Sequence, residues 1–135
     1  MKRIFLLLLI VAACITKGKA QTGKVVAINK TDCEVVVTAY CYDLCSVGIT
    51  YGPFKLTPNN PPPYQYIPDC PSSSAISTIY KVCWNDPNCA NVCVYVLGPG
   101  NGSTCGLTMG SVLSACGYCG DAKVSFNGKQ LLIQP

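Results

Sequence analysis

The cysteines constrain the fold of this chain more than any other residue type. Ten of its eleven cysteines lie within residues 21–135, and the eleventh, Cys14, lies close to the N-terminus. So high a cysteine density in a short chain is typical of secreted domains that are held together by disulfide bonds. We therefore predict five intramolecular disulfides, although the spacing does not indicate which cysteine pairs with which. The ten residues are Cys33, Cys41, Cys45, Cys70, Cys83, Cys89, Cys93, Cys105, Cys116 and Cys119.

The first twenty residues have the features of a secretory signal peptide. Lys2 and Arg3 precede an apolar run over residues 4–13, and small residues stand before Gln21. The run is too short to span a bilayer. We expect cleavage after Ala20, which leaves residues 21–135 as one secreted, extracellular, cysteine-rich domain. The alternative is cleavage before Cys14, as in a bacterial lipoprotein, because residues 11–14 resemble that processing site.

The charge balance argues against polyanionic partners. The net charge of +4 comes from Lys2, Arg3, Lys17 and Lys19, so residues 21–135 carry equal numbers of lysines and acidic residues and no arginine. A basic surface for nucleic acid or anionic lipid is therefore not expected. A sparse, balanced set of charges also favours self-association.

The patterning predicts an α+β fold in a small disulfide-rich domain. Valine-rich strands are expected over residues 25–28 and 34–40, and a further apolar strand over 92–97. Prolines cluster between residues 53 and 71, which predicts an extended crossover. Apolar residues at helical spacing predict two short helices, one over 75–83 after a serine cap and one over 103–116.

The clearest local signal is a hairpin near the C-terminal end. Asn127-Gly128 is a preferred two-residue hairpin turn, which would pair Phe126 with Lys129 and Val124 with Leu131. Ala122, Val124, Phe126, Leu131 and Ile133 would then share one buried face.

The residue types leave few routes to catalysis. The chain contains no histidine, which removes the Ser-His and Cys-His mechanisms and the usual zinc sites. Asp32 and Glu34 could form a carboxylate pair if both lay on one strand face, but a turn residue beside a solvated strand edge is the better interpretation. Cys116 and Cys119 have redox-motif spacing but follow a predicted helix rather than open one. We expect no enzyme activity, no cofactor and no metal.

Aromatic residues near the prolines are the best candidates for a binding surface. These candidates are Tyr40, Tyr42, Tyr51, Tyr64 and Tyr66, of which Tyr64 and Tyr66 follow three consecutive prolines. Trp84 lies between two cysteines, where structural packing against a disulfide is the favoured role and binding is the alternative. Asn29 and Asn101 each begin a glycosylation sequon.

Residues 93–133 resemble the C-terminal part of fungal killer-toxin-like secreted proteins. The resemblance rests on a cysteine-led apolar strand from Cys93, on the Cys-x-x-Cys-Gly turn at residues 116–120 and on a strand opened by Gly128. It covers about a third of the chain; the segment 120–128 is short for that family, and the valine-rich start does not match it. It implies a helix before the turn, and a toxin or effector role.

Together these features predict a secreted, non-enzymatic binding protein. Its partner would be an extracellular protein or a glycan, with no nucleic acid and no stable membrane insertion. The alternative function is a structural component of an extracellular matrix, cuticle or mineralised layer, which low charge, many tyrosines and the proline cluster would suit.

Overall fold

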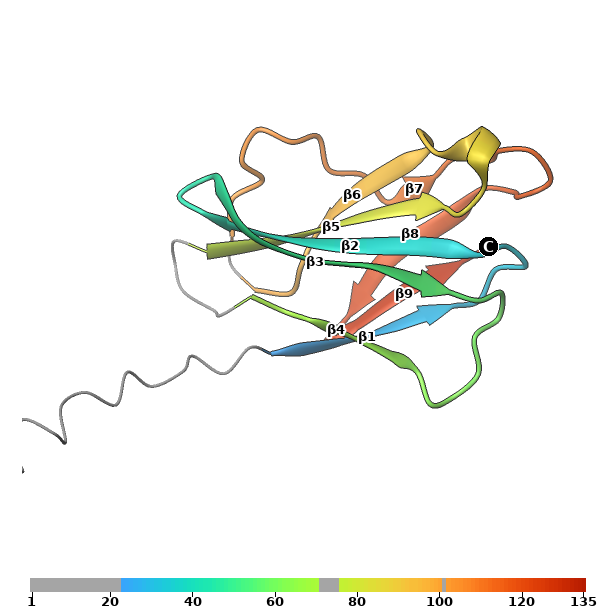
Figure 1. The fold of residues 1–135 in the computed structure, drawn as a ribbon, viewed down its shortest axis with the longest axis horizontal. Coiled ribbons are helices and arrows are strands. Elements are labelled where there is room, and N and C mark those ends of the chain that lie inside the picture. Colours follow the sequence, from blue (N-terminus) through green and yellow to red (C-terminus); the bar gives the residue numbers. More distant parts are fainter. Residues whose placement is uncertain (1–22, 71–75, 101) are drawn as a thin grey trace, which may run out of the picture.

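The computed structural model describes residues 23–70, 76–100 and 102–135, and these form a sandwich of two β-sheets (Figure 1). Nine strands and one short 3-10 helix follow each other along the chain. They are β1 (Lys24–Asn29), β2 (Val35–Asp43), β3 (Ser46–Leu56), β4 (Gln65–Pro68), β5 (Ile76–Trp84), η1 (Pro87–Cys89), β6 (Cys93–Leu97), β7 (Val112–Leu113), β8 (Ala122–Asn127) and β9 (Gln130–Gln134).

One sheet has four strands and the other has five. The four-stranded sheet has the order β3-β2-β5-β6 with antiparallel neighbours throughout. The five-stranded sheet has the order β4-β1-β9-β8-β7, and its central pair, β1 and β9, is parallel. The expected valine-rich strands are both present, but β1 and β2 lie in different sheets. The expected strand over 92–97 is present as β6.

The hydrophobic core lies between the sheets and follows from alternation along the strands. In β2 every second residue from Val35 to Cys41 is buried, and in β9 Leu131 and Ile133 are fully buried. Side chains with a period of two point to one face of a sheet, so these positions line the interior. Tyr80 and Trp84 of β5 belong to the same core cluster.

All ten predicted cysteines are paired, in five disulfides. Cys41–Cys70 ties β2 to the end of β4 and so joins the two sheets, while Cys83–Cys93 connects directly opposed residues of β5 and β6. The other three join segments between the strands to one another: Cys33–Cys119, Cys45–Cys105 and Cys89–Cys116. The prediction of a cysteine framework is confirmed.

The α+β prediction is wrong, because the described residues form an all-β fold. The segment predicted as the first helix forms β5. Ile79 and Tyr80 are both fully buried although they point to opposite faces of the sheet. β5 is an inner strand, and Ile79 is flanked on the outer face by its partners Tyr40 and Leu97. Burial on both faces places neighbouring apolar residues together and imitates helical spacing.

The second predicted helix is also absent. Residues 103–116 are largely irregular and contain only the two-residue strand β7. Cys105 and Gly106 have positive φ angles, which a helix does not allow. One end of the segment is bonded to Cys45, between β2 and β3, and the other end to Cys89 in η1. The helix that the killer-toxin resemblance implied is therefore not there, and the resemblance carries no further argument.

The C-terminal hairpin forms, with its turn displaced by one residue. Asn127 pairs with Gln130, so Gly128 and Lys129 form the turn, and Val124 faces Ile133. The displacement preserves which side chains point inward: Ala122, Val124, Leu131 and Ile133 are buried and Phe126 is partly buried against the core.

Candidate binding groove

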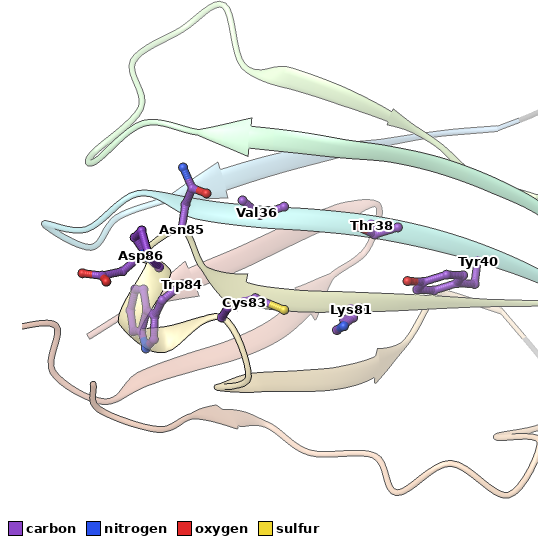
Figure 2. A pocket seen from close by; sticks show the side chains of 10 residues that line it. Val36, Thr38, Tyr40, Lys81, Cys83, Trp84, Asn85 and Asp86 are labelled. Carbon is purple, nitrogen blue, oxygen red and sulfur yellow. The ribbon is translucent and has the colours of Figure 1, made fainter. Parts of the chain in front are cut away.

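A shallow groove runs along the outer face of the four-stranded sheet, on the side away from the core. Figure 2 shows Val36, Thr38 and Tyr40 along β2, with Lys81 and Cys83 beside them on β5. Residues 84–87 and Ala90, around η1, line the other end. The groove encloses about 330 Å³ and is open to solvent. Two other hollows on the described surface measure about 210 and 150 Å³.

The walls of the groove are crosslinked and capped. Cys83, in its floor, is bonded to Cys93 on the neighbouring strand. Asp86 caps η1 by accepting a 2.8 Å hydrogen bond from the backbone N–H of Asn88, and Cys89 anchors the same turn to Cys116. A groove held in one shape loses little conformational entropy when a ligand binds.

The chemistry of the groove is polar and electrically balanced. Thr38 and Tyr40 contribute hydroxyl groups, Lys81 an ammonium group and Asp86 a carboxylate. The Asn85 amide donates a short hydrogen bond to the Glu34 carboxylate, which fixes the rim. The lining residues themselves carry one cation and one anion, so their charges balance, and the Glu34 carboxylate beside them is hydrogen-bonded to Asn85. This lining suits a neutral ligand that both donates and accepts hydrogen bonds.

Trp84, one of the expected binding residues, is a core residue. Only 2% of its surface is exposed, and its indole N–H donates a 2.8 Å hydrogen bond to the backbone carbonyl of Ser114. A buried tryptophan whose N–H is satisfied has no free ring face for stacking. Of the two roles considered from the sequence, structural packing rather than binding agrees with its buried position.

Tyr64 and Tyr66, two further expected binding residues, lie away from the groove. Tyr66 is 57% exposed on β4, at the edge of the five-stranded sheet, and the Lys24 ammonium lies 5.9 Å from its ring centre. Tyr64 is half-buried just before that strand. The structure therefore separates these tyrosines from Trp84. We call Tyr64 and Tyr66, at β4, the second aromatic surface.

Asn29, the first sequon residue, is fully buried. Its side-chain nitrogen donates to the backbone carbonyls of Cys33, Leu56 and Thr57 at 2.8, 3.3 and 3.1 Å. A glycan would have to be attached to this same nitrogen, so the geometry argues against modification of the folded domain at Asn29. The second sequon residue, Asn101, lies outside the described residues.

The two predicted carboxylates do not share a strand face. Asp32 lies in the bend before β2 and accepts a 2.8 Å hydrogen bond from the Asn59 side chain, whereas Glu34 is held by Asn85. Cys116 and Cys119 are bonded to different partners, so they do not form a redox pair. Among the described residues, no group of three or more Cys, Asp or Glu side chains is arranged to hold a metal ion.

The buried Tyr80 side chain belongs to a small hydrogen-bonded polar cluster. Its hydroxyl donates a 3.3 Å hydrogen bond to the Asp69 carboxylate, which also accepts from the Thr78 hydroxyl at 2.7 Å. Burial raises the pKa of Tyr80 well above its usual range, and the negative charge of Asp69 raises it further. This cluster lies on the inner side of the four-stranded sheet and not in the groove. Its hydrogen bonds satisfy polar groups next to the core.

Tyr40 and Trp84 were candidates from the sequence and both line the groove, but no sequence signal indicated that β2 and β5 form one site. Thr38, Tyr40 and Lys81 are ordinary outward-facing residues of β2 and β5, and they come together only because these strands are neighbours. The alternation along residues 35–41 would have placed Thr38 and Tyr40 on one face, but nothing in the sequence assigned β5 as the strand beside them.

No helix of the described residues is long and apolar enough to cross a membrane. Comparisons of the chain with protein-family models, with curated proteins and with solved structures find no match. The groove and the disulfide framework are therefore the grounds on which a function can be argued.

Proposed function

We propose that this is a secreted, non-enzymatic binding protein that holds a neutral glycan in the groove on its four-stranded sheet. Five disulfides suit a small protein stabilised for an oxidising, extracellular environment. The observation that carries the proposal is a crosslinked groove whose lining has balanced charges and offers hydroxyl, ammonium and carboxylate groups beside a tyrosine ring. Sugars present many hydroxyl groups and one apolar ring face, and this lining complements both.

Two variants of groove residues test the proposal. Tyr40→Ala removes the ring and Lys81→Ala removes the cation, and neither side chain is part of the core. The labelled protein would be applied to an immobilised panel of neutral and acidic oligosaccharides. We expect the wild type to bind at least one neutral oligosaccharide and each variant to bind it about tenfold or more weakly. The reason is that a few aromatic and charged residues carry much of the binding energy of an interface.

Tyr66→Ala is the matched control, since it truncates an exposed tyrosine on the other sheet. Unchanged binding by this variant assigns the ligand to the groove. Loss of binding in Tyr66→Ala or Tyr64→Ala, with Tyr40→Ala unaffected, would move the site to the second aromatic surface. Cleavage of any oligosaccharide that disappears in Glu34→Gln would contradict the non-enzymatic part of the proposal.

A structural matrix component is the second candidate. Leu44, Val47 and Ile49 expose much of their apolar surface at one end of the molecule, which favours association with other macromolecules. Extraction of the native protein separates the two functions. A matrix component would stay insoluble until reductant or decalcification releases it, whereas a glycan-binding protein would be freely soluble.

A further inference from the structure

The groove is small for a binding site, but the row of side chains along its β2 wall continues beyond it. The groove encloses about 330 Å³, near the lower end of the range for ligand sites in proteins. Val36, Thr38 and Tyr40 line it, and Tyr42 is the next residue of β2 in the same alternating row. Because every second side chain of a strand points to the same face, Tyr42 belongs to the outer face of the four-stranded sheet. This face therefore offers more contact surface than the groove alone.

Tyr40 and Tyr42 form an aromatic pair at the end of the groove away from η1. Figure 2 shows Tyr40 at this end, far along β2 from Asn85 and Asp86. The two ring centres are 6.4 Å apart, and the ring planes are inclined by 49°. Both side chains are half-buried, so each ring keeps part of its surface open to solvent. A tyrosine ring offers an apolar face and a hydroxyl group, and both suit a sugar.

The outer face is bounded beside Tyr42 by a loop at residues 102–105. Ser77 of β5 pairs with Tyr42, and its hydroxyl oxygen accepts a 2.7 Å hydrogen bond from the backbone N–H of Ser103. Gly102 packs so closely on this serine that an added Cβ would lie 2.7 Å from the same oxygen. A disulfide ties the loop to the turn between β2 and β3. The outer face thus has a boundary at each end, with η1 at one and the 102–105 loop at the other.

We propose that the ligand is a linear glycan chain that runs along β2, from the groove across Tyr40 and Tyr42 to the 102–105 loop. This inference rests on the proposed function, because it extends the same site. The row from Val36 to Tyr42 spans about 20 Å, at about 3.3 Å per residue. A single sugar unit is shorter than this row and could contact only one of the two rings. A linear chain repeats its apolar ring faces, so successive units can contact both.

The surface that the aromatic pair adds to the groove also favours a neutral chain. Tyr40 and Tyr42 each have a neighbour on both flanking strands, and all four neighbours are uncharged. They are Ile79 and Ser77 on β5, and Thr50 and Val47 on β3. An acidic polysaccharide would meet no cation on this added surface, whereas the hydroxyl groups of a neutral chain need none.

Isothermal titration calorimetry with cello-, N-acetylchito- and manno-oligosaccharides of increasing length tests the inference. In at least one series, the affinity of the wild type should rise as the chain grows and should level off once the chain spans both rings. Tyr42→Ala should bind the longest members about tenfold more weakly, because it removes one aromatic contact. The same variant should bind the shortest member that the wild type binds with unchanged affinity, which also shows that it is folded. Tyr40→Ala should weaken every member, because Tyr40 lines the groove itself.

Tyr64→Ala is the matched control, since Tyr64 is also half-buried but lies just before β4 of the other sheet, and it should leave the whole series unchanged. Equal affinity of the wild type for the shortest and the longest members would overturn this inference and leave the groove proposal standing. So would an equal loss at every length in Tyr42→Ala. Binding of no member of any series would also overturn the inference, and a negative oligosaccharide panel would overturn the proposed function as well.

Discussion

At the scale of single residues, Asn29 does more for this fold than its place in a sequon indicates. Its side chain links the end of β1 to three carbonyl groups, and its own oxygen accepts from the backbone N–H and the hydroxyl of Thr31 at 3.0 and 2.7 Å. All of these groups are buried or partly buried. Buried polar groups are stable only when they are hydrogen-bonded, so the amide is hard to replace by any other side chain.

Asn29→Asp should therefore destabilise the protein strongly. The change preserves shape but replaces a donor with a second acceptor that faces three carbonyl oxygens. We expect the free energy of unfolding to fall by about 3 kcal/mol or more, since buried groups lose their partners and a charge is buried. Denaturant titration measures the change. Asn127→Asp, at an exposed position, is the control and should change stability by less than about 0.5 kcal/mol.

At the scale of elements, strands that are buried on one face could be predicted from the sequence and the rest could not. Val35, Val37 and Ala39 alternate with half-buried neighbours, so β2 was recognisable. β5 is buried on both faces and was mistaken for a helix. The groove escaped prediction for the same reason, because it needs β2 and β5 side by side. Alternation along a segment shows which way its residues face, but not which other segment lies next to it.

The β8–β9 turn provides a test at this scale. Gly128 has a φ of 56°, and an added Cβ would meet no atom within 4 Å, so only backbone conformation opposes a side chain there. Gly128→Ala should cost about 1 kcal/mol, because L-residues are disfavoured in the left-handed region. Gly120 is equally unobstructed but its φ is outside that region, so Gly120→Ala should be neutral or slightly stabilising. Thermal unfolding of both variants would measure the contrast; equal losses would contradict this account.

At the scale of the whole molecule, crosslinks between distant parts of the chain should dominate stability. Cys33–Cys119 closes a loop of 86 residues and Cys83–Cys93 one of 10. In the chain-entropy model a disulfide stabilises the fold by lowering the entropy of the unfolded chain, and the effect grows with the length of the closed loop. The stabilisation is about 5 kcal/mol for the first bridge and about 3 kcal/mol for the second.

The double variant Cys33→Ala/Cys119→Ala should thus lose about 2 kcal/mol more than Cys83→Ala/Cys93→Ala. Denaturant unfolding of the two variants would compare them directly. The wild type should take up no alkylating label without reductant, as measured by intact mass. Labelling of two or more cysteines would contradict a fully crosslinked domain, and a larger loss from the short bridge would show that native-state packing outweighs loop length.

The parallel pairing of β1 with β9 has a consequence for how the protein is made. The two strands are neighbours in the middle of one sheet, yet Val26 pairs with Gln130 and Asn29 with Ile133. While the ribosome is still adding residues 30–129, β1 has no such neighbour, so the five-stranded sheet cannot be completed before residues 130–133 have been made. Contacts between segments this far apart form slowly, and a chain that waits for them stays open to chaperones and to the enzymes that exchange disulfides. Completion of this sheet therefore waits for the last strand of the domain to be made.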